Sequence, residues 1–325
     1  MRQRTEVLTA SDFNIAEVPV AHLASGQVLL RTLMLALDPY LAQSMKSWVG
    51  ETPRWSEGII HGRVLAEVVE SCAEGFEAGD VITGLGAWQE HQVCDAGSIR
   101  RVEPNITPPS LVLGALGASG WSAWVGLRLA DLEPGQTLLV SAATGTVGGI
   151  AGQLARQRGS RVIGLVGGEA KRRHALDVLG FDACVDHRAP DLPRQIAEVA
   201  GEGIHAVFEN VGTPSIDAAL PSMVRHGRII LCGLAAHYNS PDPPTMGNIV
   251  QLLYKQIAVM PFAIGENRHL LAQARRELLD GVLSGAITCD ETITEGFLDA
   301  PRAYLGMLTG AGLGKRLHRI AHRIG

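Results

Sequence analysis

The sequence predicts an α/β protein of two domains: a parallel sheet covered by helices, and a smaller strand-rich domain. Chain length is the first reason, since 325 residues exceed what one simple hydrophobic core usually holds. Residues 1–115 are rich in short strand-like runs broken by Gly and Pro, which indicates a small β-barrel-like domain. After residue 135, strand-like and helix-like segments alternate, and this alternation is typical of parallel βα units.

The N-terminal region is expected to supply the strands of the barrel-like domain. Residues 28–37 form a strand candidate that ends at the turn Asp38-Pro39-Tyr40, and residues 62–71 form another. A polar turn at 75–80 leads into the next strand. Helix-like periodicity begins only at residues 119–129, so the change of architecture falls between these two regions.

The alternating region is expected to build a parallel sheet that binds ligands at the carboxyl ends of its strands. We expect strands at 137–142, 161–166, 183–185, 206–209, 227–232 and 258–264, and helices at 146–158, 169–179, 190–200, 216–223, 248–256 and 269–284. A Pro-rich loop covers 240–248. The chain is expected to close with a helix at 300–308 and a strand at 317–320.

The most informative segment is TLLVSAATGTVGG, which runs from Thr137 to Gly149. Gly145 and Gly148 follow the strand at the spacing of the last two glycines of the dinucleotide fingerprint GxGxxG, and Ala143 stands in place of the first. In such a unit the bare backbone and the helix N-terminus hold the pyrophosphate, which predicts a Rossmann fold. The expected contacts come from Thr144, Gly145, Thr146 and Val147. The alternative is a glycine-rich turn that binds no ligand.

The end of the second strand favours NADP over NAD. NAD enzymes usually carry an acidic residue there that accepts hydrogen bonds from the adenosine ribose, but this strand ends at Gly167. Glu169 comes two residues too late, and Lys171 opens a basic run. A 2′-phosphate is attracted by lysine and repelled by an acid. The alternative is that the basic run only forms the solvated face of a helix.

The composition argues against several functional classes. The formal charge is −5, so no nucleic-acid surface is expected. The N-terminus lacks the apolar core of a signal peptide and no uninterrupted stretch reaches transmembrane length, so no membrane partner is expected. The five cysteines show no CxxC spacing, which is typical of free thiols in a reducing compartment. We therefore expect a cytoplasmic protein.

Metal ligands do not gather at recognisable spacings. His61 is followed by Gly62 and Arg63 rather than by an acid, and Cys72 and Cys94 have no partner at ligand spacing. No run of four cysteines is present for a structural zinc site. We expect no metal, and hydride chemistry that is assisted by hydrogen-bond donors alone.

Motifs along nearly the whole chain resemble one family. They are Leu37-Asp38-Pro39-Tyr40, Val68-Val69-Glu70-Ser71, Phe76-Glu77-Ala78-Gly79-Asp80-Val81, VSAATGTVGG, Leu179-Gly180-Phe181-Asp182-Ala183, Phe208-Glu209-Asn210-Val211-Gly212, Cys232-Gly233-Leu234, Tyr238-Asn239 and Gly306-Met307-Leu308-Thr309-Gly310. In this order they resemble the zinc-independent medium-chain dehydrogenases/reductases of the prostaglandin reductase, leukotriene B4 12-hydroxydehydrogenase and alkenal double-bond reductase group. That group includes bacterial curcumin-reductase-like members.

The resemblance implies a fold, a cofactor and a reaction. The fold is a GroES-like β-barrel catalytic domain of residues 1–116 and 290–325, with a doubly wound Rossmann domain of residues 117–289 inserted between them. The implied cofactor is NADPH, and the implied reaction is reduction of the C=C bond of an α,β-unsaturated aldehyde or ketone. A homodimer joined at the sheet edge is also implied.

The resemblance further assigns cofactor contacts. Lys171 matches the family's 2′-phosphate lysine, and Asn210 begins the loop along the nicotinamide. Cys232 and Gly233 are further implied contacts. His187 stands where a tyrosine often helps to hold the 2′-phosphate. The family's PYMR becomes Pro39-Tyr40-Leu41-Ala42, and Gly312 replaces an asparagine, so the strictness of NADPH over NADH stays open.

Tyrosines are the candidate catalytic residues. Hydride addition to the β-carbon of an enone places negative charge on the carbonyl oxygen, so a donor aimed at that enolate lowers the barrier. Tyr238 follows the 227–232 strand and matches the family's tyrosine at the substrate, so it is the expected donor and also a cofactor contact. Tyr40 is expected to line the pocket, and Tyr254 is a further candidate. A ribose hydroxyl of the cofactor is the alternative donor.

Two other functional classes stay open. The protein could be an NADP-dependent alcohol/ketone oxidoreductase, or a non-catalytic NADPH-binding protein. The substrate pocket could include Trp48, Trp55, Met45 and Met246, or these residues could be ordinary core.

Overall fold

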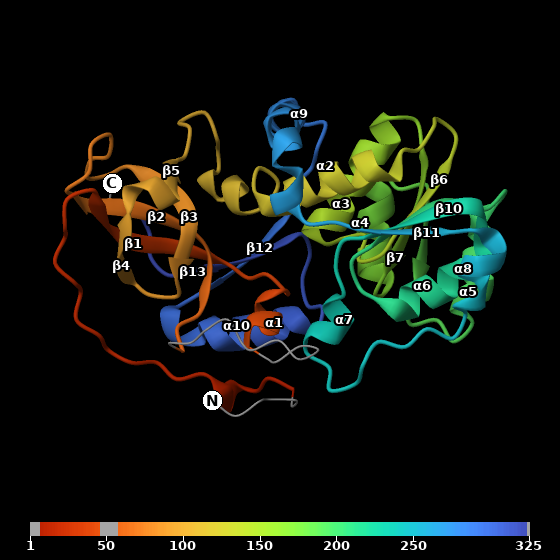
Figure 1. The fold of residues 1–325 in the computed structure, drawn as a ribbon, viewed down its shortest axis with the longest axis horizontal. Coiled ribbons are helices and arrows are strands. Elements are labelled where there is room, and N and C mark those ends of the chain that lie inside the picture. The colour runs from red at the N-terminus through yellow and green to blue at the C-terminus, as the bar shows by residue number, and fades with distance from the viewer. Residues whose placement is uncertain (1–6, 46–57, 324–325) are drawn as a thin grey trace. The chain divides into compact units, whose positions relative to one another are not determined.

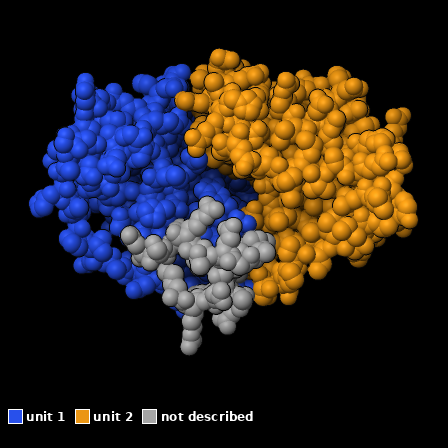
Figure 2. Space-filling view, viewed as in Figure 1, with its two compact units in different colours: residues 1–114, 291–325 blue, residues 115–290 orange. Residues whose placement is uncertain are grey.

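The computed structural model describes residues 7–45 and 58–323. The chain divides into two compact units (Figure 2). Unit 1 contains residues 1–114 and 291–325, and unit 2 contains residues 115–290. Each unit is built on its own sheet (Figure 1).

Unit 1 contains a seven-stranded sheet in the order β12-β13-β1-β2-β3-β5, with β4 also paired to β1. Its strands are β1 (Gln27–Ala36), β2 (His61–Ser71), β3 (Val81–Ala87), β4 (His91–Asp95), β5 (Ile99–Arg101), β12 (Glu291–Glu295) and β13 (Lys315–Arg319). All pairings are antiparallel except that of β12 with β13. β13 brings the end of the chain beside β1.

Alternating apolar residues bury one face of this sheet. Val28 and Leu30 of β1, Ala66 and Val68 of β2, and Ile82 of β3 are buried together in one cluster. Successive residues of a strand point to opposite faces, so this spacing of two suits a half-buried strand. The helices of unit 1 are α1 (Leu41–Met45) and α10 (Ala300–Leu308), with short 3₁₀ turns at Ala10–Asp12, Ala96–Ser98, Pro109–Leu113 and Phe297–Asp299.

Unit 2 contains a six-stranded parallel sheet in the order β11-β10-β9-β6-β7-β8. Its strands are β6 (Thr137–Val140), β7 (Arg161–Val166), β8 (Ala183–Asp186), β9 (Ile204–Glu209), β10 (Met223–Leu231) and β11 (Ala258–Pro261). The sheet grows outward in both directions from β6 and β9. The strand order therefore reverses between these two strands, which is where doubly wound sheets bind their ligands.

Helices connect the strands of unit 2. They are α2 (Ala118–Ala130), α3 (Thr146–Gln157), α4 (Glu169–Asp177), α5 (Leu192–Ala200), α6 (Thr213–Ala219), α7 (Ala235–Tyr238), α8 (Val250–Lys255) and α9 (Leu271–Leu283), with 3₁₀ turns at Leu220–Ser222 and Ile264–Leu270. The strands β6, β7 and β9 are apolar along nearly their whole length, as expected for strands buried on both faces.

The predicted fold class is confirmed, and several element boundaries differ from the prediction. The strand expected at 137–142 ends at Val140, because the chain turns at Ala142 with a φ of 48°. The helix expected at 216–223 begins at Thr213 and stops before Pro221, which has no N–H to continue the helical hydrogen bonds. The strand expected at 258–264 ends at Pro261 for the same reason.

Candidate functional site

The turn after β6 accommodates Ala143 in place of the first glycine of the fingerprint. The left-handed position belongs to Ala142. Ala143 is fully buried, and its methyl group lies where a side chain on Gly164 of β7 would have to go. The neighbouring strand therefore makes room for the alanine, and the turn keeps its tight form.

The next glycines bring bare backbone to the start of α3. A Cβ on Gly148 would lie 2.5 Å from the carbonyl oxygen of Ala142, so only glycine fits there. Gly145 is the N-cap of α3, and no side chain caps that helix. The N–H groups of Thr146 and Val147 in the first turn consequently remain available to an anionic group, with Thr144 buried just before them.

A basic cluster lies at the carboxyl ends of β7 and β8. Nε2 of His187 and Nη2 of Arg188 lie 3.0 and 3.3 Å from the position that a Cβ on Gly167 would take. Burial lowers the pKa of His187, and the charges of Arg188 and Lys171 lower it further. His187 and Arg188 thus lie at a glycine where NAD enzymes carry an acid, and the charge of Lys171 acts on the same histidine.

Glu169 is paired with two arginines of α4. Its carboxylate accepts a hydrogen bond from Nε of Arg172 at 2.8 Å and lies 3.8 Å from Nε of Arg173. These side chains form an exposed ion-pair group on α4, as the solvated-face alternative predicted for part of the basic run. The charge of Lys171, in the same basic run, acts on His187 and lowers its pKa.

The loops after β6 and β9 meet across the point where the strand order reverses, and the loop after β10 is bound to the end of β9. The N–H of Asn210 donates to Ser141 Oγ at 2.7 Å, and its Nδ2 donates to the carbonyl oxygen of Ser141 at 2.9 Å. The N–H groups of Cys232 and Gly233 donate to the carbonyl oxygen of Glu209 at 2.9 and 3.1 Å. Asn210, Cys232 and Gly233, which the resemblance assigned to the cofactor, therefore lie in one hydrogen-bonded group.

Tyr238 is the last residue of α7 and is buried. Its hydroxyl oxygen accepts the N–H of Leu234 at 2.9 Å, and this leaves the phenol proton for another acceptor. Burial raises the pKa of Tyr238, while the N–H of Leu234 opposes that rise. The phenol therefore stays protonated at neutral pH and can act as a donor.

Tyr40 belongs to unit 1, in the turn between β1 and α1. Its side chain is 42% exposed. Burial of the hydroxyl and the charge of Asp38 raise the pKa of Tyr40 to about 12. Asp38 in turn forms an ion pair with Lys315 at the start of β13, and both of these side chains are largely buried. The turn that carries Tyr40 is thus held in place by the buried ion pair between Asp38 and Lys315.

Tyr254, the third tyrosine considered as a donor, lies away from the carboxyl edge of the unit 2 sheet. Tyr254 is 68% exposed on α8, and its carbonyl oxygen accepts a hydrogen bond from Arg225 near the amino end of β10. Met246 packs against the core of unit 2. Met45 is half-buried on α1, whereas Trp48 and Trp55 lie outside the described residues. Tyr254 is therefore a poor candidate for the donor.

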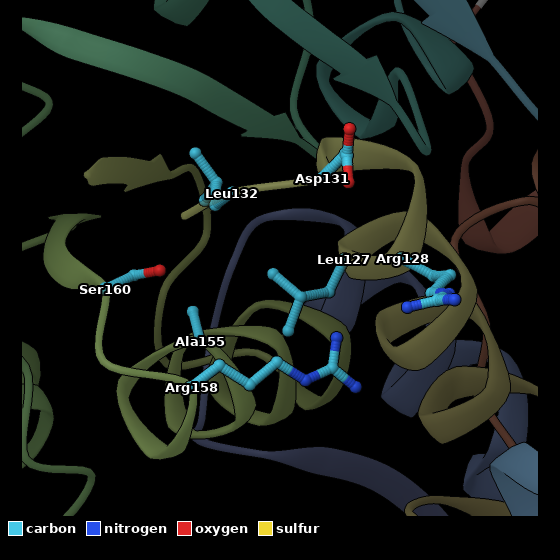
Figure 3. A pocket seen from close by; sticks show the side chains of 7 residues that line it. All are labelled: Leu127, Arg128, Asp131, Leu132, Ala155, Arg158 and Ser160. Atoms are coloured by element: carbon cyan, nitrogen blue, oxygen red, sulfur yellow. The ribbon is translucent and has the colours of Figure 1, made fainter. Parts of the chain in front are cut away.

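A pocket in unit 2 lies at the opposite edge of the sheet. Figure 3 shows its lining residues, Leu127, Arg128, Asp131, Leu132, Ala155, Arg158 and Ser160. Ser160 directly precedes β7, so the pocket lies at the amino ends of the strands. The guanidinium of Arg158 is already placed over the Trp124 ring, 5.9 Å from its centroid, and 3.5 Å from Glu277. This pocket is therefore separate from the carboxyl edge, where a doubly wound sheet binds its cofactor.

Within residues 7–45 and 58–323, no group of three His, Cys, Asp or Glu side chains is arranged to hold a metal ion. No helix in this part of the chain is long and apolar enough to cross a membrane.

Three residues of the site were not anticipated from the sequence. Arg188 reaches the cofactor edge through the space above Gly167, and Ser141 and Glu209 join the loops after β6 and β9. Arg188 could have been found from its place directly after His187. Ser141 and Glu209 are separated by 68 residues, so only the pairing of β6 with β9 brings them together.

Two family models match the chain. A model described as zinc-binding dehydrogenase matches residues 146–280, and one described as N-terminal domain of oxidoreductase matches residues 1–102. The NADPH-dependent curcumin reductase of Escherichia coli (strain K12) is 36% identical over 322 residues, which cover 95% of this chain and 92% of that protein. Prostaglandin reductase 1 of Bos taurus is 34% identical over 95% of this chain and 94% of its own.

The chain belongs to the curcumin reductase and prostaglandin reductase family of the medium-chain dehydrogenases/reductases. The resemblance seen in the sequence is thereby confirmed. The fold agrees as well: the crystal structure of CurA from Vibrio vulnificus in complex with NADPH superposes with a TM-score of 0.92. That protein is 33% identical, and the match covers 98% of this chain and 97% of the other.

Proposed function

We propose that this protein uses NADPH to reduce the C=C bond of α,β-unsaturated aldehydes or ketones. The observation that carries the cofactor is the basic cluster around Gly167, where an NAD enzyme would carry an acid. The reaction is supported by relatives named curcumin reductase, prostaglandin reductase and 2-alkenal reductase.

The residues at the carboxyl edge of unit 2 fit this cofactor. Bare backbone at Gly145 and Gly148 and the uncapped start of α3 suit a pyrophosphate, with Thr144, Thr146 and Val147 as its contacts. Lys171, His187 and Gly167 are proposed to hold the 2′-phosphate, together with Arg188. Asn210, Cys232, Gly233 and Tyr238 are proposed to lie along the nicotinamide half.

NADPH, when bound, would supply a hydride for the β-carbon of the substrate, and a proton from solvent or a side chain would complete the reduction at the α-carbon. Tyr238 is proposed to donate its phenol proton in a hydrogen bond to the carbonyl oxygen, where negative charge develops. The N–H of Leu234 fixes the phenol oxygen from its other side, so the O–H is oriented before the substrate arrives. Tyr40 is proposed to line the substrate pocket as a neutral hydroxyl, since its pKa is raised to about 12.

The domain assignment is also proposed: residues 1–116 and 290–325 as the catalytic domain, and residues 117–289 as the dinucleotide-binding domain. We further propose that the enzyme needs no zinc. The support is the sequence at His61, which is followed by Gly62 and Arg63 rather than by an acid. A cytoplasmic location is supported by the five cysteines, which are all free thiols in the structure.

A homodimer is proposed through the edge strand of unit 2. β11 ends the strand order, and Val259 on it is 44% exposed. On the adjacent α8, Leu253 and Tyr254 are 74% and 68% exposed. An exposed strand edge flanked by apolar side chains is suited to pairing with a second copy. Light scattering tests this, and Val259→Lys is expected to shift a dimer toward the monomer.

The experiment that tests the reaction follows loss of NADPH absorbance with a series of enals and enones. Saturated aldehydes and ketones serve as controls, and product analysis shows which bond was reduced. Turnover of NADP⁺ with secondary alcohols, but no turnover of enones, would establish the alcohol/ketone oxidoreductase instead. Tight NADPH binding without any turnover would establish a binding protein.

A further inference from the structure

Glu209 is a buried carboxylate that the proposed chemistry does not use. It is the last residue of β9, and none of it is exposed. A carboxylate in such a place is costly unless donors surround it, so its partners indicate its role.

The carboxylate joins three segments of unit 2. Oε1 accepts hydrogen bonds from Ser141 Oγ at 2.8 Å and from the N–H groups of Val211 and Gly212 at 2.5 and 2.6 Å. Oε2 accepts one from Ser215 Oγ, in the first turn of α6, at 2.8 Å. The end of β6, the loop after β9 and the start of α6 therefore meet at one side chain.

The main chain of the same residue supports the next loop. Its carbonyl oxygen accepts the N–H groups of Cys232 and Gly233 after β10. Asn210 is held by Ser141, whose hydroxyl is held in turn by Glu209. Asn210, Cys232 and Gly233 thus share Glu209 as their common support.

The network can accommodate a proton. Backbone N–H groups only donate, so Oε1 remains an acceptor in both protonation states. Ser215 Oγ lies 2.9 Å from the carbonyl oxygen of Gly212. It can therefore donate its hydrogen bond to that oxygen and accept one from Oε2 when Glu209 is protonated. Burial raises the pKa of Glu209 to about 7, and its four donors oppose that rise.

Burial favours the neutral form of the two neighbouring titratable groups. Burial and the charge of Glu209 raise the pKa of the Cys232 thiol to about 12, so it stays neutral. His237 contacts the start of α6 through Nε2, 3.3 Å from the N of Thr213, and burial lowers its pKa. A change in the loops near neutral pH therefore reports on Glu209.

We propose that Glu209 is a positioning residue whose carboxylate holds the loop after β9, next to the loop after β10 that its carbonyl oxygen holds, in the arrangement that accepts the nicotinamide half of NADPH. This inference rests on the proposed function. Glu209 acts through Asn210, Cys232 and Gly233 and does not itself touch the cofactor. Hydrogen bonds to an ionised carboxylate are about twice as strong as those to a neutral group, so the loop after β9 is held more firmly when Glu209 is ionised.

The test compares two ligands on the full-length protein. NADPH carries the nicotinamide half, and adenosine 2′,5′-bisphosphate carries only the adenosine half. Dissociation constants are measured by calorimetry at about pH 6.5 and about pH 8.5, on either side of the pKa of Glu209. Glu209→Gln keeps the acceptor at Oε1 and an amide that can donate to Ser215. Glu198→Gln, on the exposed face of α5, is the control for loss of one charge.

At the higher pH, Glu209→Gln is expected to bind NADPH roughly tenfold more weakly, because neutral hydrogen bonds replace charge-assisted ones. Its affinity for adenosine 2′,5′-bisphosphate is expected to match the wild type. The ratio of the two wild-type constants is expected to change with pH by more than the ratio for the variant, which changes only through titration of the ligand phosphates.

Equal weakening of both ligands would show a merely structural role and overturn the proposal, as would unchanged NADPH affinity. If Glu209→Gln does not fold, the pH dependence of the ratio for the wild-type protein decides. If the wild-type protein bound neither ligand, the proposed function itself would fail, and this inference with it.

Discussion

Arg188 is expected to contribute to the preference for NADPH over NADH. Its guanidinium lies over Gly167 beside His187, where the 2′-phosphate of the cofactor is proposed to bind. Replacement by alanine removes one positive charge without touching the turn after β6. The affinity for NADPH is therefore expected to fall, and that for NADH, which has no 2′-phosphate, is expected to stay unchanged.

The size of the effect follows from the exposure of Arg188. Two unit charges at contact distance attract by about 1 kcal/mol in water and about 4 kcal/mol near a protein surface. The attraction of an exposed side chain lies toward the lower value. We therefore expect Arg188→Ala to cost about 1–2 kcal/mol of binding free energy, which raises the dissociation constant for NADPH roughly 5- to 30-fold. Salt screens exposed charges, so the loss is expected to shrink as ionic strength rises.

The assay is a titration of nicotinamide fluorescence with each cofactor at low and high salt. Arg194→Ala is the matched control, because Arg194 is an exposed arginine of α5 that pairs with Glu198 at 2.9 Å. Equal losses for NADPH and NADH would refute the reasoning, since they would place Arg188 at a part of the cofactor that both share. An unchanged NADPH affinity would refute it too.

Three further predictions concern catalysis and stability. Tyr238→Phe is expected to lower kcat/KM for an enone about 10²-fold and to leave the NADPH dissociation constant unchanged; full activity would assign the donor role to a cofactor hydroxyl. The raised pKa of Glu209 means that the folded state keeps its proton to higher pH than the unfolded chain, so the free energy of unfolding is expected to fall by about 3 kcal/mol as pH rises from about 4.5 to about 7. Denaturant titrations check this, and an equal pH dependence in Glu209→Gln would contradict it. Lys315→Met is expected to cost about 3–5 kcal/mol because it strands the buried Asp38, against under about 1 kcal/mol for Arg194→Ala; equal melting temperatures would contradict it.

The sequence was sufficient for the fold and for the turn after β6. Glycine spacing and the alternation of strand and helix are local patterns, so they can be recognised in the sequence alone. Local patterns do not explain how the turn accommodates Ala143 in place of the first fingerprint glycine. The room comes from Gly164 on the next strand, where a side chain would collide with Ala143. That compensation depends on the pairing of β6 with β7.

The parts that the sequence missed depend on contacts between distant segments. Tyr254 looked like a possible donor, yet α8 precedes β11, and its C-terminal residues consequently lie at the amino end of the parallel strands. Arg188 was overlooked because its role depends on Gly167 having no side chain. The pattern of polar residues gave no signal for Glu209, whose donors come from β6, from α6 and from its own loop.

The Glu209 network is better explained by function than by stability. Its pKa lies near 7, so at neutral pH the ionised form weakens the fold that surrounds it. A buried apolar or amide side chain would avoid that cost. What the carboxylate adds is a single acceptor that fixes Val211, Gly212 and Ser141 together, while its carbonyl fixes the loop after β10. A group that costs stability and orders two loops at the cofactor edge is expected where the site must be rigid before its ligand binds.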